Sequence, residues 1–203
     1  MKHLRQYIRQ ILLTEGMKTA DELPDGFVVV IKQIAPGHYA VYYGKQDDQS
    51  HRVLNSVRAE GGPWGRVSFG KPWLEEEGNC DGALKVGGAN ANPGWGPLLY
   101  DIAIEYATQN ANGLIADRDS VSGEAHTVWD YYMHNRKDVT QHQLDNLTND
   151  LTPEIEEDNC DQRVAGDRDR RPRLFVGSSL SKRYTKEPTT INSLKAAGKL
   201  VML

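Results

Sequence analysis

The amino-acid sequence predicts an α/β fold, in which helices flank a mixed β-sheet within a single domain. Two patterns predict it: β-branched and aromatic runs in the first third of the chain, and a strand–turn–helix–strand–helix order in the middle. The length of 203 residues suits one sizeable core, and four Trp and nine Tyr can anchor that core although 26% of the residues are charged. We therefore expect a folded body with polar loops.

The first residues predict an N-terminal amphipathic helix. Over residues 4–12, apolar side chains recur at helical spacing, while arginines and glutamines occupy the other face. The apolar positions are Leu4, Ile8, Ile11 and Leu12. Such a helix needs a partner surface, either on its own domain or on another protein. With the turn that follows, it defines an N-terminal helix and linker at residues 1–26.

A hairpin is predicted next, because β-branched and aromatic runs at residues 27–34 and 38–43 flank a Pro-Gly turn. Shorter strands are predicted at residues 52–54 and 66–69, on either side of a glycine-rich stretch. These strands open the main body of the domain, which we expect to span residues 27–186.

The middle of the chain predicts a strand at residues 83–86, a small-residue stretch, and a helix from Pro97 to about Thr108. Pro97 suits the first helical turn because its missing N–H would have no intrahelical partner there. A strand at residues 114–116 follows, and then a helix for which residues 119–122 supply the N-cap candidates. This order implies parallel pairing within a mixed sheet.

The last third predicts a short helix near residues 141–147 and late strands at residues 174–176 and 180–184. A closing helix at residues 190–197 comes next, and the final residues form a tail that docks on the body. Residues 187–203 are therefore predicted as a C-terminal helix and tail.

The charge pattern argues against a nucleic-acid or membrane partner. The net charge is −4 and the basic residues are interspersed with acidic ones, so no basic face is available to neutralise phosphates. No run of about eighteen apolar residues occurs, and the first residues lack the apolar core of a secretory signal. We expect the protein in a cytoplasm.

Two cysteines, Cys80 and Cys160, lie in similar acidic contexts. A disulfide between them stays open as an alternative, but a single pair makes neither a disulfide framework nor a zinc site of recognisable spacing, so we expect free thiols. The six histidines also lack metal-ligand spacing, and no metal site is predicted.

The turn Gly94–Gly96 ahead of Pro97 is the strongest motif. A helix N-terminus presents backbone N–H groups without intrahelical partners and a partial positive charge, and glycines let a pyrophosphate approach closely. The predicted donors are the amides of Gly94, Trp95, Gly96, Leu98 and Leu99. A plain strand-to-helix turn is the alternative interpretation of the same residues.

The order of parts over about residues 80–136 resembles the central motif of the GNAT N-acetyltransferases. That resemblance implies that the glycine loop binds the pantetheine-pyrophosphate of acetyl-CoA and that the next strand diverges from its neighbour to admit the cofactor. It also implies a small residue and an aromatic on the following helix, here Ala125 and Trp129. Ala91 stands where the family usually has Arg or Gln, and a hairpin replaces its opening strand and two helices.

The implied reaction is the attack of an acceptor amine, on a protein or a small molecule, on the thioester of acetyl-CoA. Backbone N–H groups polarise the carbonyl and a tyrosine protonates the departing thiolate. Tyr132 and Tyr131 are the candidate acids, because Trp129 fills the usual tyrosine position; a core role is the alternative for Tyr132. Candidate bases (Glu124, His126, Asp117) have simpler interpretations as a helix-start carboxylate, a surface imidazole and a cap.

The whole chain also resembles small GNAT-like proteins of tailed bacteriophages, in the leader at residues 4–13 and the stretch at residues 180–188. This resemblance implies a viral acetyltransferase in the host cytoplasm. The alternative is a catalytically inactive virion component that docks to other virion proteins through residues 4–12.

Overall fold

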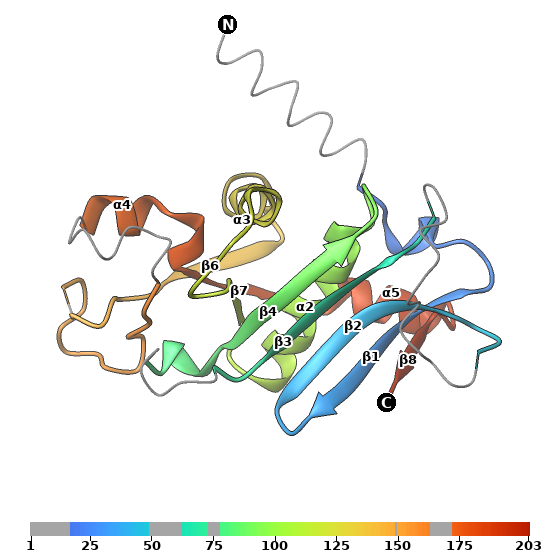
Figure 1. Cartoon of the computed structure of the whole chain (residues 1–203), viewed down its shortest axis with the longest axis horizontal. Coiled ribbons are helices and arrows are strands. Elements are labelled where there is room, and N and C mark those ends of the chain that lie inside the picture. Colours follow the sequence, from blue (N-terminus) through green and yellow to red (C-terminus); the bar gives the residue numbers. More distant parts are fainter. Residues whose placement is uncertain (1–16, 49–61, 73–77, 149, 163–171) are drawn as a thin grey trace, which may run out of the picture.

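One curled mixed sheet organises the molecule (Figure 1). The computed structural model describes residues 17–48, 62–72, 78–148, 150–162 and 172–203, and in these residues eight strands pair in the order β6-β7-β5-β4-β3-β2-β1-β8. The strands are β1 (Phe27–Ala35), β2 (His38–Lys45), β3 (Gly65–Gly70), β4 (Leu84–Ala91), β5 (Leu114–Ile115), β6 (Val139–Gln143), β7 (Lys182–Lys186) and β8 (Leu200–Met202). The predicted α/β class and single domain are confirmed.

Four α-helices accompany the sheet in the described residues. They are α2 (Gly96–Asn110), α3 (Gly123–Asn135), α4 (Pro172–Gly177) and α5 (Thr189–Ala196). Short 3-10 helices lie at Ala20–Glu22 (η1), Cys80–Gly82 (η3) and Ser179–Ser181 (η6). The predicted helix at residues 4–12 and the predicted strand at residues 52–54 lie outside the described residues.

Most of the central predictions are confirmed. β1 and β2 form the expected antiparallel hairpin, β3 pairs with β2, and β4 runs parallel to β5 with α2 between them in sequence. Of the predicted N-cap candidates at residues 119–122, Ser122 is the one that caps α3, since its hydroxyl accepts the N–H of Ala125 at 3.2 Å. The tail docks on the body as β8, which pairs in parallel with β1 at the edge of the sheet.

Two predicted elements in the last third are wrong. Residues 139–143 form strand β6 rather than the start of a helix, because they pair antiparallel with β7 along five registers from Val139–Lys186 to Gln143–Lys182. Residues 174–176 belong to helix α4 rather than to a strand, and Pro172 stands at its start. Tertiary pairing in one case and a proline start in the other outweigh local propensity.

The main core lies between the sheet and the helices. The buried face of α2, including Leu99, Ile102 and Ala103, packs on apolar side chains from the strands beneath it. A fully buried ion pair joins Glu105 of α2 to Lys186 of β7, and the Glu105 carboxylate also accepts the N–H groups at the start of α5. Because every charged group in this cluster has partners, the pair ties α2, β7 and α5 together.

Cys80 and Cys160 form a disulfide, so the expectation of free thiols is wrong. The connection from β6 to β7 returns to the start of β4, where Cys80 donates its backbone N–H to the carbonyl of Asn159 at 2.9 Å. Two residues that are 80 positions apart in sequence thereby come to a Cα–Cα distance of 4.5 Å. Only the tertiary path of this connection brings the two thiols within bonding range.

Candidate ligand-binding site

The parallel pair β4 and β5 separates almost as soon as it forms. The two strands pair only at Leu84–Leu114 and Lys85–Ile115, although β4 continues to Ala91 and stays paired with β3 on its other side. In the part of the chain that the structure describes, no strand pairs with residues 86–91 on the β5 side. The far half of a central strand is therefore left open, and residues 87–90 are exposed.

A β-bulge at Gly87 marks the place where β4 changes course. Ser68 of β3 pairs with Gly88 and Phe69 pairs with Val86, which leaves Gly87 as the extra residue. Bulges bend a strand and increase its twist, and they are frequent beside active sites. The bulge gives a physical reason why β4 leaves β5 at this point.

The glycine turn that follows β4 is held rigidly. Gly94 has φ +82°, a left-handed conformation that favours glycine, and the N–H of Trp95 donates to the carbonyl of Asn92 at 3.0 Å. The indole of Trp95 is buried, and the backbone carbonyl of Trp95 accepts a hydrogen bond from the hydroxyl of Tyr43 at 2.7 Å. The backbone of Lys18 adds a further bond, to the carbonyl of Gly94. Contacts within the protein are therefore enough to hold the turn.

The five predicted amide donors are not equivalent in the structure. The N–H of Trp95 is engaged within the turn, and Leu99 is the fourth helical residue, where the N–H closes the first intrahelical bond. Gly96 and Leu98 stand in the first turn of α2, where no intrahelical acceptor exists, and the N-terminal residue of α2 has no side-chain cap. The helix start therefore offers the amides of Gly96 and Leu98 to an anion.

A pocket of about 420 Å³ adjoins this helix start. Its lining includes Leu98 and Asp101 of α2, Tyr131 and Arg136 near the end of α3, and the segment 17–21. Three hydroxyl residues at the start of α5 complete it: Thr189, Thr190 and Ser193. The lining thus combines apolar side chains such as Leu98 with charged and hydroxyl groups.

Sequence reasoning missed the ion pair inside this pocket. Arg136 donates two hydrogen bonds to the Asp101 carboxylate, at 2.9 and 3.0 Å, and a further pair to Asp138. Burial raises the pKa of Asp101, while the charge of Arg136 opposes that rise. Asp101 and Arg136 are 35 positions apart in sequence, so no local pattern could have revealed them.

The two predicted catalytic tyrosines have different surroundings. Tyr132 is fully buried, and its hydroxyl lies 2.7 Å from the Asp101 carboxylate and 3.2 Å from the carbonyl of Pro97. Burial, with the nearby Asp101 charge, raises the pKa of Tyr132 well above its ordinary value. Tyr131 is only partly buried and lines the pocket. Trp129, at the position expected for an aromatic, is buried and stacks on Tyr184 with ring centroids 5.0 Å apart.

The three candidate bases have the surroundings of a cap, a surface imidazole and a helix-start carboxylate. The Asp117 carboxylate accepts the N–H groups of Asp119 and Ser120. His126 is exposed and faces Asp130 at 3.5 Å, and Glu124 is exposed in the first turn of α3. Of the three, none lines the pocket.

No helix in the described parts of the chain combines the length and the apolar character needed to cross a bilayer. Within the same residues, no three His, Cys, Asp or Glu side chains are grouped so as to hold a metal ion. No known family model matches the chain, and neither the curated proteins nor the solved structures contain a match to it.

Proposed function

We propose that this protein is a GNAT-like acyltransferase that binds acetyl-CoA where β4 leaves β5 and transfers the acetyl group to an amine. One observation carries the proposal: β4 loses its partner after two registers, directly before a rigid glycine turn and the uncapped start of α2. An open strand edge beside a helix N-terminus offers hydrogen-bond donors to an extended ligand that ends in a pyrophosphate.

In this proposal the pyrophosphate accepts the amides of Gly96 and Leu98, and the thioester lies along the exposed backbone at residues 87–90. The acceptor amine attacks the thioester carbonyl, the C–N bond forms and the C–S bond breaks. The N–H groups of β4 stabilise the developing oxyanion, and the departing thiolate takes up a proton.

Tyr131 suits the role of proton donor better than Tyr132. The hydroxyl of Tyr132 already has the Asp101 carboxylate as its acceptor, so that bond must break before its proton can reach a ligand. Tyr131 lines the pocket beside Leu98 and keeps its side chain partly exposed. We expect Tyr131→Phe to lower the acetylation rate while the Kd for acetyl-CoA stays within about threefold.

Isothermal titration of the purified chain with acetyl-CoA tests the binding step. A Cβ at Gly96 would meet only the Cβ of Ala91, at 3.6 Å, so side chains are accommodated there. Gly96→Glu is therefore expected to weaken binding at least tenfold through charge repulsion, and Gly96→Gln, its neutral match, to weaken it less. Absence of heat at high micromolar acetyl-CoA, or equal effects of the two variants, contradicts the proposal.

The second candidate function is a catalytically inactive, GNAT-like virion component. The contact between Tyr132 and Asp101 favours it, because it removes one of the two candidate acids from the ligand side. An inactive protein binds acetyl-CoA weakly or not at all, and deletion of residues 1–13 releases it from its virion partners while the body stays folded. Persistent association after that deletion rules out docking through residues 4–12.

A further inference from the structure

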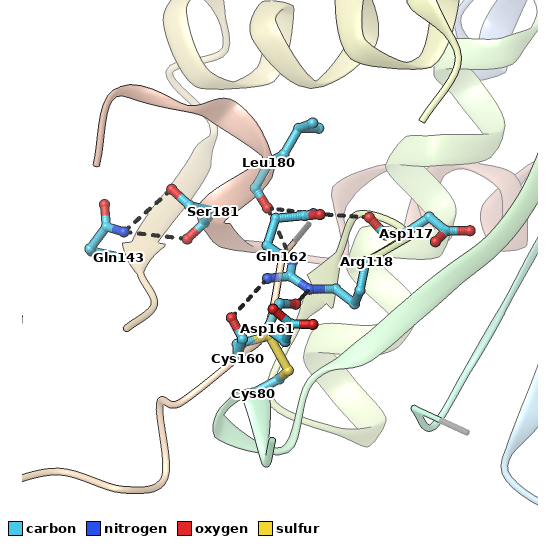
Figure 2. The surroundings of a disulfide bond; sticks show 9 residues. All are labelled: Cys80, Asp117, Arg118, Gln143, Cys160, Asp161, Gln162, Leu180 and Ser181. Carbon is cyan, nitrogen blue, oxygen red and sulfur yellow. Dashed lines mark hydrogen bonds between the residues drawn. A yellow bond between two sulfur atoms is a disulfide. The ribbon is translucent and has the colours of Figure 1, made fainter. Parts of the chain in front are cut away.

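A buried arginine, Arg118, holds the chain in place just beyond the end of β5. Arg118 lies three residues beyond the end of β5 and is 1% exposed. Its guanidinium donates to three backbone carbonyls, those of Asp161 at 2.6 Å, Leu180 at 3.1 Å and Cys160 at 3.3 Å. Figure 2 shows the Arg118 side chain among these carbonyls, with the disulfide beside it. An arginine whose donors are shared among three separate carbonyls fixes the path of its own backbone.

Gln162 adds a second link between the same two segments, because here the donor lies in segment 160–162 and the acceptor beside Arg118. Its buried side-chain amide donates to the carbonyl of Asp117 at 2.9 Å and to the carbonyl of Leu180 at 3.1 Å. Residues 117–118 are therefore bound to the segment 160–162 and to Leu180, two residues before β7. Since β7 pairs with β5 on the side opposite to β4, these bonds draw the chain away from β4.

The disulfide fixes the segment that holds Arg118. Cys160 is bonded to Cys80, four residues before β4 begins, and the backbone N–H of Asp81 donates to the carbonyl of Glu157 at 2.6 Å. Cys80 and Asp81 have φ values of 50° and 54°, left-handed conformations that are costly for residues with side chains. A salt bridge from Arg183 to Asp81, at 2.6 Å, helps to hold this backbone.

We propose that Arg118 is a positioning residue that keeps the chain beyond β5, residues 116–118, apart from β4, and that the Cys80–Cys160 disulfide is the anchor through which it acts. The inference rests on the proposed acetyl-CoA site, because the opening that Arg118 maintains is where that ligand lies. In the oxidised protein the opening is preformed. In the reduced protein segment 157–162 loses its covalent attachment, the three carbonyls no longer stay fixed, and the opening loses its shape.

The chemistry of the switch is thiol–disulfide exchange with a small-molecule dithiol or disulfide. In reduction, one thiolate of dithiothreitol attacks a cysteine sulfur and its second thiol resolves the mixed disulfide. Two electrons and two protons pass to Cys80 and Cys160, and the reductant becomes a cyclic disulfide. Oxidised glutathione reverses the change and leaves two molecules of glutathione.

Hydrogen exchange and acetyl-CoA titration on the full chain test the proposal together. The variants are Arg118→Lys, which keeps the charge but not the fork of donors, and Cys80→Ser with Cys160→Ser. Val30→Ala, a cavity variant of β1 on the opposite face of the sheet, serves as the stability control. Arg118→Lys and the double serine variant are called the clamp variants. In both we expect at least tenfold faster amide exchange at residues 114–118, measured relative to α2, and at least tenfold weaker acetyl-CoA binding.

Val30→Ala is expected to leave both quantities within about threefold of wild type once exchange is normalised to α2. Wild-type reduction by dithiothreitol is expected to reproduce the double serine variant, and reoxidation by glutathione disulfide to reverse it. If the clamp variants keep wild-type exchange at residues 114–118, or if Val30→Ala changes it equally, the positioning role is refuted. If wild type does not bind acetyl-CoA while the clamp variants still change exchange, the proposed function fails and the role of Arg118 in setting the opening survives.

Discussion

The two ends of β4 are stabilised in opposite ways. At its start, β4 pairs with β5, the disulfide joins Cys80 to Cys160, and Arg118 binds three carbonyls nearby. At its far end the strand has glycines and alanines, keeps only β3 as a strand partner among the described residues, and is exposed from residue 87 to residue 90. Covalent and buried polar contacts thus hold one end of the strand, while the other end lies open.

The largest expected effect concerns the closed end. Replacing Cys80 and Cys160 together by serine removes a link across 80 positions of chain, and the free energy of unfolding should fall by about 4 kcal/mol. Urea unfolding followed by tryptophan fluorescence measures the change. Dithiothreitol should destabilise the wild type but have no further effect on the double variant. An equal response of the two proteins to the reductant would contradict a stabilising disulfide.

The burial of Tyr100 in α2 should make the protein sensitive to alkali. Burial raises the pKa of Tyr100, which packs on Trp129, from 10.0 to about 12. Its neutral form therefore stabilises the folded state below pH 10, and that stabilisation is lost as the pH rises from 10 towards 12. The expected loss is about 2–3 kcal/mol in the free energy of unfolding. Tyr100→Phe should lose less over the same range in urea titrations, and an unchanged alkaline loss in this variant would exclude Tyr100 as the cause.

The open end should respond in binding rather than in stability. Ala89 pairs with Val67 and so faces the α2 side of the sheet, whereas Gly88 faces the other side. Ala89→Leu should weaken acetyl-CoA binding about tenfold, which is about 1.4 kcal/mol, by filling the opening. Gly88→Ala adds a Cβ that meets only Ser68 Oγ at 3.6 Å, and it should keep the wild-type Kd within about threefold. Equal calorimetric Kd values for Ala89→Leu and wild type would place the ligand elsewhere.

The smallest expected change in the free energy of unfolding comes from the start of α3, a few residues beyond Arg118. Ser122→Ala removes the hydroxyl that accepts the N–H of Ala125, and the free energy of unfolding should fall by about 1 kcal/mol. Ser120→Ala, at an exposed position two residues earlier, should change it by less than about 0.5 kcal/mol. Thermal or urea unfolding distinguishes the two variants, and a matching loss in both would show that the cap is not the source.

Local patterns predicted the middle of the fold well. The apolar stripe after Pro97, the serine ahead of Ala125 and the β-branched runs at residues 27–43 each encode their element through spacing or backbone geometry. The same patterns failed at residues 141–147 and 174–176, where strand pairing with β7 and a proline helix start decided the outcome.

The candidate site could be predicted only in part. The sequence drew attention to the Gly94–Gly96 turn because glycines and a proline have strong backbone preferences. It did not predict that Trp95 would use its own N–H within the turn, nor that Tyr132 would contact Asp101. Both contacts depend on where neighbouring elements lie.

The sequence by itself determined the α/β class, the hairpin, the helix after the glycine turn and the parallel unit around it, because each depends on residues close together in the chain. The tertiary structure decided the disulfide, the three-carbonyl contact of Arg118, the bulge at Gly87 and the separation of β4 from β5. The disulfide and the contact of Arg118 form only once the connection from β6 to β7 has folded back onto the start of β4, whereas the bulge depends on the pairing of β3 with β4.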